Sequence, residues 1–443
     1  MTMFRSLRNI GLAAALATFS LPAMQDNAHA MNIQDVTSPG GIKAWLVEEH
    51  GLPLIALRFG FKGGASQDPD GKEGVANLLT TLMDEGAGDL KAAAFQQRME
   101  ELAVKMSFDA GRDTLSGSFQ TLTANRDEAI QLFKMALTKP RFDEDAVARM
   151  KASVMSSLAF DAKDPNKVAS RAWSEAAFAG HPYARPVKGT LDSLKAITAD
   201  DLESYRERVM ARDTLRVTVV GDITPEELGP MLDDMFGGIS ETSQRRDIPP
   251  LTIPETGATK LVEMDVPQSV AQFGHRAFAR DDKDFIASYI LNYIIGGGGF
   301  NSRLMEEVRE KRGLAYSVYS YVAPYEHAAI FLGGVATKNE EINRSLDVIR
   351  DVLTRMANEG PSQVELDNAK QYLTGSYALR FDSSSKIASQ LFWVQMEDLG
   401  KAYITDRNSL IEAVTLDDIK RVAKRLLKPD SLIVTIVGKP SKS

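Results

Sequence analysis

The residue types that most often hold metal ions or act as nucleophiles are scarce in this chain. It contains no cysteine and five histidines, of which His50, His181, His275 and His327 follow residue 30. No two of these four are four residues apart, the spacing that places two imidazoles on one face of a helix. The lack of cysteine excludes disulfides, thiolate metal sites, iron–sulfur clusters and cysteine nucleophiles. His181, which precedes a proline, is expected to be a structural hydrogen-bonding residue.

The glycine-rich stretch GGGGFNSR at 296–303 could suggest a phosphate-binding loop. No G-K-[ST] follows it, the last glycine of a G-x-G-x-x-G pattern would be Asn301, and an apolar helical pattern rather than a strand precedes it. A Ser-His-Asp hydrolase has no support either, because no G-x-S-x-G is present. The stretch is predicted to be a hinge or substrate-facing loop between helices, or a helix end with additional glycines.

Composition limits the class of protein and the kind of partner. The 443 residues are too many for one ordinary core, so two or more domains are expected. The formal net charge of -8 argues against nucleic acid or an anionic membrane as the main partner.

The first thirty residues have the pattern of a signal peptide. Arg5 and Arg8 precede an apolar stretch from Ile10 to Met24, and Ala28-His29-Ala30 fits a cleavage site. That stretch is shorter than the roughly 20 residues that span a bilayer, and no later stretch is long enough. We therefore expect an exported, periplasmic protein without a membrane span, which begins at Met31.

The two halves of the chain repeat one pattern. Residues 197–223 align without a gap with 414–440, and each segment has a threonine N-cap, an amphipathic helix and a β-branched strand that ends in glycine. The helical pattern at 75–88 pairs with that at 286–299. Proline, serine and threonine crowd between the halves, at 241–257, which is typical of a linker. Strand-like and helical stretches mix in each half, so the sequence predicts two duplicated α+β domains, 31–240 and 258–443.

Several separated motifs resemble the pitrilysin/insulinase zinc peptidases, in the two-domain branch that includes mitochondrial processing peptidase. They are ASQDPDGKEGVANLLTTLMDEGA at 65–87, HPYARPVKGTLDSLKAITADDLESY at 181–205, VVGD at 219–222 and GGGGFNSRLMEEVREKRGLAYSVYS at 296–320. The resemblance implies two homologous α+β domains, each an antiparallel-rich sheet covered by helices, which together form half of a clamshell.

The same resemblance shows that the metal-binding residues of this family are replaced. Its members carry H-x-x-E-H on the first-domain helix, with two zinc-binding histidines and a glutamate that acts as general base. Here Asn77 and Thr81 stand at the histidine positions, Thr80 stands at the glutamate position, and Ser157 stands where a further zinc-binding glutamate is expected. These side chains are poor zinc ligands, and threonine cannot accept a proton from water near neutral pH.

We therefore predict no metal and no cofactor in this chain. Asp84 and Glu85 lie one turn further along the helix and are expected to be solvated acids rather than displaced ligands. One feature of the family's chemistry is present in this chain. Family peptidases use an arginine and a tyrosine of the second domain, and the stretch VREKRGLAY supplies Arg309 and Tyr316 at the same spacing. A tyrosine hydroxyl can bind an oxyanion, and a guanidinium can bind a carbonyl or carboxylate group.

The stretch from Ser107 to Thr121 alternates polar and apolar residues, which predicts a strand. Related peptidases bind extended substrate at a strand edge in this region, so β-augmentation is possible, and an ordinary sheet strand is an equal alternative.

The predicted function is the non-zinc subunit of a heterodimeric periplasmic metallopeptidase. A homologous H-x-x-E-H subunit would bind zinc, and Arg309 and Tyr316 would act on peptide substrates in trans. One alternative is a non-catalytic structural or peptide-binding protein of the same family. Another is a stand-alone peptidase with a rearranged metal site, which predicts stoichiometric zinc in the purified chain.

Overall fold

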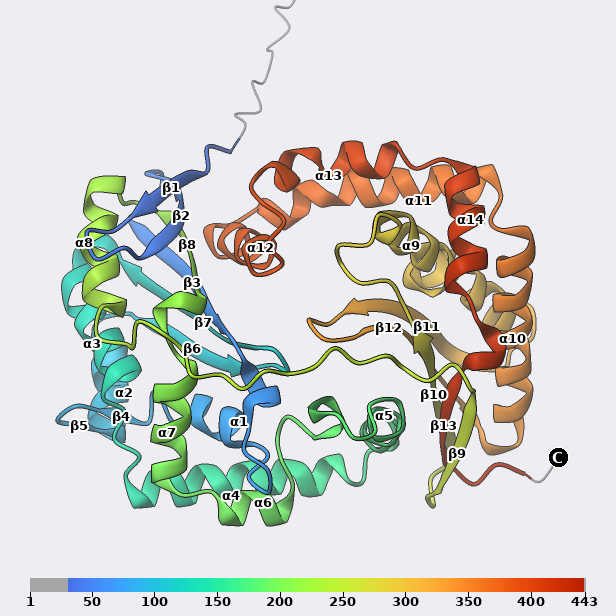
Figure 1. The fold of residues 1–443 in the computed structure, drawn as a ribbon, viewed down its shortest axis with the longest axis horizontal. Helices are drawn as coiled ribbons and strands as arrows, with labels where there is room; N and C mark the ends of the chain where they lie inside the picture. The colour runs from blue at the N-terminus through green and yellow to red at the C-terminus, as the bar shows by residue number, and fades with distance from the viewer. Residues whose placement is uncertain (1–30, 442–443) are drawn as a thin grey trace, which may run out of the picture. The chain divides into compact units, whose positions relative to one another are not determined.

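Two mixed sheets, one from each half of the chain, form the centre of the structure (Figure 1). The computed structural model describes residues 31–441, so the predicted signal peptide lies outside the described residues. The first sheet has the strand order β1 (Gln34–Thr37), β2 (Lys43–Glu48), β8 (Leu215–Gly221), β3 (Leu54–Lys62), β7 (Thr114–Leu122) and β6 (Lys105–Ala110). The second has the order β9 (Ala258–Glu263), β13 (Ile433–Gly438), β10 (Gln268–Arg276), β12 (Ala329–Lys338) and β11 (Ala315–Pro324).

The second sheet repeats the first strand for strand, apart from β1. In each sheet one pair is parallel, β2 with β8 and β9 with β13, and the remaining pairs are antiparallel. The aligned strands β8 and β13 both end in a glycine with positive φ, Gly221 at 150° and Gly438 at 144°. A Cβ on Gly221 would lie 2.1 Å from the Leu54 carbonyl oxygen, so only glycine fits there. The predicted duplication in two α+β, antiparallel-rich sheets is confirmed.

The helices that precede these strands begin as predicted. Helices α7 (Ala199–Val209) and α14 (Leu416–Leu426) each open with a capping box, in which Thr198 and Thr415 exchange hydrogen bonds with Asp201 and Asp418.

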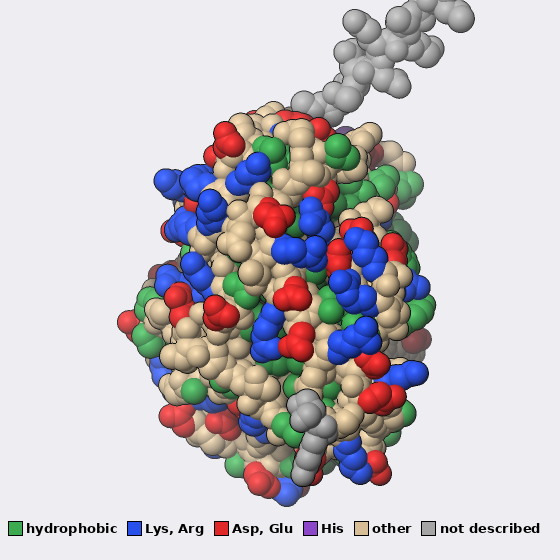
Figure 2. Space-filling model, turned by 90° about the vertical axis from the view of Figure 1, so that its right-hand side faces the viewer, with side chains coloured by type: hydrophobic (Ala, Val, Ile, Leu, Met, Phe, Trp, Pro, Cys, Tyr) green, Lys and Arg blue, Asp and Glu red, His purple; other side chains and the backbone are tan. Residues whose placement is uncertain are grey.

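The other helices cover the sheets and the space between them. They are α1 (Val75–Thr80), α2 (Ala92–Glu101), α3 (Arg126–Thr138), α4 (Glu144–Asp161), α5 (Pro165–Ala177), α6 (Leu191–Ala196), α8 (Pro225–Phe236), α9 (Phe285–Asn292), α10 (Ile342–Glu359), α11 (Gln363–Gly375), α12 (Ser384–Met396) and α13 (Ala402–Glu412). Figure 2 shows one side of the molecule, on which basic and acidic side chains are interspersed. None of the helices between residues 31 and 441 has the length and apolar character that a membrane crossing requires.

Each half covers one sheet of the other half with a helix. Helix α12 packs on β3 and β8, and α5 packs on β10 and β13 (Figure 1). The contacts include a hydrogen bond from the Trp173 indole N–H to the Ile433 carbonyl oxygen, 2.9 Å, and one from the Thr218 hydroxyl to the Ala388 carbonyl oxygen, 2.8 Å.

Two glycines make room for this exchange. A Cβ on Gly60 in β3 would lie 2.6 Å from a ring atom of Phe392 in α12, and a Cβ on Gly274 in β10 would lie 2.8 Å from a ring atom of Trp173 in α5. The two glycines hold the same place in the duplicated strands. The large aromatic side chains of the two exchanged helices therefore rest directly on the backbone of the opposite sheet.

The prediction of one strand from Ser107 to Thr121 is wrong. The segment is a hairpin, in which β6 ends at Ala110, β7 begins at Thr114, and the turn between them contains Gly111 and Asp113. The glycine and aspartate favour a turn, and this local preference breaks the alternating pattern. Strand β6 is the edge of its sheet. Residues 241–257 form neither helix nor strand, although Ile253 is buried against Trp173 and Tyr183.

We expect Gly60→Ala and Gly274→Ala each to lower the free energy of unfolding by about 1–3 kcal/mol. The added methyl group would overlap Phe392 of α12 in the first variant and Trp173 of α5 in the second. Urea denaturation measures the change. Gly375→Ala is the control, since a Cβ there meets no atom within 4 Å. Equal stability of the Gly60 and control variants would contradict the tight packing.

We also expect a pH dependence of stability from His275. Burial lowers the pKa of its imidazole to about 4, although its Nδ1–H donates to the Arg276 carbonyl oxygen, 2.7 Å. The unfolded chain binds this proton near pH 6.5 and the folded chain does not, so up to about 3 kcal/mol of stability is lost as the pH falls from 6.5 to 4.

Replacing His275 by Asn keeps a hydrogen-bond donor and removes the titration. The slope of unfolding free energy against pH should therefore flatten between pH 6.5 and 4.5. His50→Asn is the control, because Asp222 and Glu48 shift the pKa of that exposed imidazole upward, opposite to His275, so removing it should not flatten the slope. An unchanged slope in the His275 variant would contradict the prediction.

Candidate functional site

The two residues predicted for catalysis lie together on the surface of the second half. Arg309 is in the π-helical turn Met305–Glu310, and Tyr316 is in β11. The guanidinium lies between two aromatic rings, 4.6 Å from the ring centre of Phe300 and 5.0 Å from that of Tyr316. Tyr316 is 81% exposed and Phe300 is 64% exposed. Phe300 is thus a third member of the site, which sequence analysis missed.

Arg309 differs from the basic residues around it because it has no acidic partner among the described residues. Arg303 forms a bidentate pair with Glu365, and Lys311 and Arg312 both pair with the buried Glu307. Burial by itself would raise the pKa of the Glu307 carboxyl, yet its cationic neighbours lower it to about 2. The turn that carries Arg309 is therefore anchored by its neighbours, while its own guanidinium stays free.

The glycine run positions Phe300 by close packing. Gly296 is buried at the end of the π-helical turn Tyr293–Gly297, and a Cβ there would lie 2.4 Å from the Ser320 hydroxyl of β11. Gly299 has a φ of 58°, which favours glycine. The run therefore serves as a tight junction between α9 and β11 and leads directly into the ring that covers Arg309.

This arrangement can bind an anion or a polarised carbonyl group. The Arg309 Cζ lies over both rings, and the guanidinium carries five N–H donors that have no acidic partner among the described residues. The exposed Tyr316 hydroxyl has no hydrogen-bond partner among residues 31–441 and can donate to a ligand beside Arg309. A guanidinium fork and a phenol are suited to a carboxylate, or to the oxyanion that forms when a peptide carbonyl is attacked.

The residues at the family zinc positions are engaged in local hydrogen bonds. On α1, the Thr80 hydroxyl donates to the Asn77 carbonyl oxygen and the Thr81 hydroxyl to that of Leu78, both at 2.8 Å. The Ser157 hydroxyl in α4 accepts from the Lys188 ammonium, 3.0 Å. A resident ammonium group repels a second cation, and none of these side chains is a usual zinc ligand. These positions do not fit a zinc ion.

The two acidic residues beyond α1 differ from the prediction in one respect. Glu85 pairs with Arg149, but Asp84 is half-buried rather than solvated, and burial raises the pKa of its carboxyl group. Its place at the end of the helix, against the following turn, accounts for the difference.

The start of α1 is fixed by a residue that sequence analysis did not single out. The buried carboxylate of Asp68 accepts the backbone N–H groups of Gly74, 2.7 Å, and Ala76, 3.0 Å. Burial raises the pKa of the Asp68 carboxyl to about 7, although these two donors favour its charged form. The helix is therefore held in place by its own N-terminal contacts without any metal.

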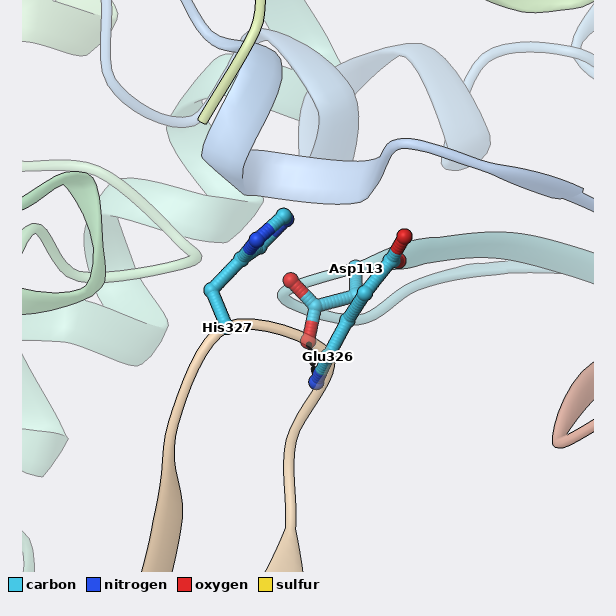
Figure 3. Close-up of side chains that lie close together, drawn as sticks. All are labelled: Asp113, Glu326 and His327. Atoms are coloured by element: carbon cyan, nitrogen blue, oxygen red, sulfur yellow. Dashed lines mark hydrogen bonds between the residues drawn. The ribbon is translucent and has the colours of Figure 1, made fainter. Parts of the chain in front are cut away.

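A second group of polar residues lies where the two halves meet. Asp113 in the β6–β7 turn, and Glu326 and His327 in the β11–β12 turn, bring carboxylate oxygens and a ring nitrogen within 4.8 Å of one another (Figure 3). The Tyr183 hydroxyl lies 2.6 Å from both Asp113 oxygens. The sequence carries no signal for this group, because Asp113 and Glu326 are 213 residues apart.

His181 is a structural residue, as expected. Its Nε2 contacts the Pro249 carbonyl oxygen at 2.9 Å, and its Nδ1 accepts the Tyr183 backbone N–H at 3.1 Å.

Two family models match the chain. Residues 50–191 match insulinase, peptidase family M16, and residues 196–373 match the peptidase M16 inactive domain. The chain belongs to the M16 family. The recognised resemblance to insulinase-type peptidases is thereby confirmed, and Arg309 and Tyr316 lie within the inactive-domain match.

One relative and two solved structures are similar to this chain over most of its length. A Helicobacter pylori protein named non-peptidase homolog YmxG is 29% identical over 339 residues, which cover 76% of this chain and 78% of that protein. The crystal structure of an M16 inactive domain from Pseudomonas fluorescens has a TM-score of 0.87 at 29% identity and covers 93% of this chain and 98% of its own. The periplasmic protease PqqL of Escherichia coli has a TM-score of 0.79 at 17% identity, over 99% of this chain and 49% of its own.

Proposed function

We propose that this chain is the non-zinc subunit of a two-chain M16 peptidase. A homologous partner with an intact H-x-x-E-H motif would hold the zinc ion and the general base. This chain would supply Arg309 and Tyr316, which bind the peptide substrate and stabilise the oxyanion of the transition state in trans. Two such chains would close like a clamshell around a chamber, and unfolded peptides small enough to enter it are the substrate class.

The observation that carries the proposal is the contrast between two sets of residues. The Arg309 guanidinium is unpaired among the described residues and lies over two exposed rings, although Arg303, Lys311 and Arg312 on either side of its turn are all paired. At the family zinc positions, Thr80, Thr81 and Ser157 are occupied by local hydrogen bonds. A chain with a free anion-binding pair and no metal ligands at the family zinc positions would take its catalytic metal from another chain.

The signal-peptide pattern at residues 1–30 supports a periplasmic location for this complex. A periplasmic protease is among the structures that this fold resembles.

The second candidate is a structural or peptide-binding protein without any catalytic role. The name of the Helicobacter pylori relative, a non-peptidase homolog, favours it. In that case Arg309 and Tyr316 would bind peptide and no mixture of chains would hydrolyse it.

We expect Tyr316→Phe to lower kcat of the reconstituted complex by about 10²–10³-fold, because one oxyanion donor is lost. The stability of this chain should not change, since the hydroxyl contacts no other described residue. Tyr372→Phe is the matched control, which removes an exposed hydroxyl from α11. An unchanged kcat in the Tyr316 variant would refute the role given to this residue.

We expect Arg309→Lys to lower kcat/KM by at least about tenfold, because lysine keeps the charge but loses the planar fork and the stacking on both rings. Arg350→Lys in α10 is the control, as that side chain has only one distant acidic neighbour, Asp347 at 3.9 Å. Steady-state kinetics of the complex measures both. Equal activity of the two variants would show that charge alone suffices at position 309.

A further inference from the structure

The group at the junction of the two halves has the composition of a metal site. Asp113 and Glu326 offer carboxylate oxygens and His327 offers an imidazole nitrogen, all within 4.8 Å of one another. Figure 3 shows the three side chains close together, with Asp113 contributed by the first half and the other two by the second half. Asp113 and Glu326 also line a cavity of about 600 Å³.

No lysine or arginine among residues 31–441 forms an ion pair with the carboxylates of this group. Neither Asp113 nor Glu326 has a lysine or arginine nitrogen within ion-pair distance among the described residues, although most acids nearby do, such as Asp398 with Lys62 at 2.8 Å. Burial raises the pKa of the Asp113 carboxyl, and the charge of Glu326 adds to this effect. A cation placed among these oxygens would relieve the repulsion between them.

The site also has a partner that orients one of its ligands. The Tyr183 hydroxyl donates to Asp113 and accepts the backbone N–H of His327, 3.0 Å. The backbone N–H of Glu326 donates to Asp113 Oδ2, 3.2 Å. Because a carboxylate has about four lone-pair sites, Asp113 keeps capacity to bind a metal ion while these contacts hold its orientation.

The imidazole of His327 is free to act as a ligand. Neither of its ring nitrogens has a hydrogen-bond partner within residues 31–441, whereas both nitrogens of the neighbouring His181 are used. One imidazole with two carboxylates is a donor set that suits zinc and similar divalent transition metals better than magnesium or calcium, which prefer oxygen ligands alone.

We infer that Asp113, Glu326 and His327 form a divalent transition-metal site that ties the first half of the chain to the second. Each half supplies ligands through a β-turn, so an ion bound there cross-links the two turns. The site is separate from the H-x-x-E-H positions and from Arg309 and Tyr316. Its role is to stabilise the junction of the folded chain.

The test is zinc binding to the full chain, purified without a histidine tag. Calorimetry with a zinc salt should give about one equivalent of bound zinc, and zinc should raise the melting temperature, because it binds only the folded chain. Glu326→Gln and His327→Gln change half-exposed or exposed side chains, so both variants should fold. Each should weaken zinc binding by at least about tenfold and reduce the thermal shift at a given zinc concentration.

His50→Gln is the matched control. His50 also lies between two carboxylates, Asp222 at 2.8 Å and Glu48 at 3.3 Å, but they sit on different ring nitrogens and cannot share one ion with the imidazole. This variant should bind zinc as the natural chain does. Equal zinc affinity in the natural chain and in the His327 and Glu326 variants would overturn the inference, as would calcium or magnesium giving the same stabilisation as zinc.

The result of this zinc-binding test can be distinguished from the result of testing the proposed function. Zinc in the purified chain would otherwise suggest a stand-alone peptidase, so the metal content has to be compared with that of His327→Gln. Loss of zinc from this variant with unchanged peptide cleavage by the two-chain complex would support both proposals. Loss of cleavage together with zinc, at unchanged melting temperature, would contradict the structural role given to the ion.

Discussion

The exchange of two helices between the halves is the constraint on which the rest of the structure depends. Phe392 of α12 rests on Gly60 of the first sheet, and Trp173 of α5 rests on Gly274 of the second. Any larger residue at either glycine would push a helix of the other half away from its sheet. Because each half completes the core of the other, the two sheets are held in one folded unit, and the turns that meet at Tyr183 are brought together.

This constraint explains how the chain can lose metal ligands and keep its fold. Helix α1 is fixed at its start by Asp68 and does not need an ion, so Asn77, Thr80 and Thr81 are tolerated there. The Arg309 turn is anchored by Glu307 in a part of the second half that packs independently of α1. The residues at the family zinc positions can therefore change without disturbing the Arg309 turn. A two-chain peptidase in which one chain binds the metal and the other contacts the substrate requires this independence.

Features with local causes could be predicted from the sequence. The threonine caps of α7 and α14 and the glycines that end β8 and β13 act over a few residues, so the duplication was evident. The hairpin at 105–122 was missed because two short alternating stretches, one on each side of the Gly111–Asp113 turn, were interpreted as one strand. The stacking of Phe300 on Arg309, and the meeting of Asp113 with Glu326, depend on how distant segments pack, and no local pattern encodes them.

The most direct measurement is peptide cleavage by this chain alone, by an H-x-x-E-H M16 chain alone, and by their mixture, each with and without a chelator. The account predicts cleavage only in the mixture, and its loss when the chelator removes zinc from the partner. Full activity of the partner alone, with no gain on adding this chain, would contradict it, as would chelator-sensitive cleavage by this chain alone.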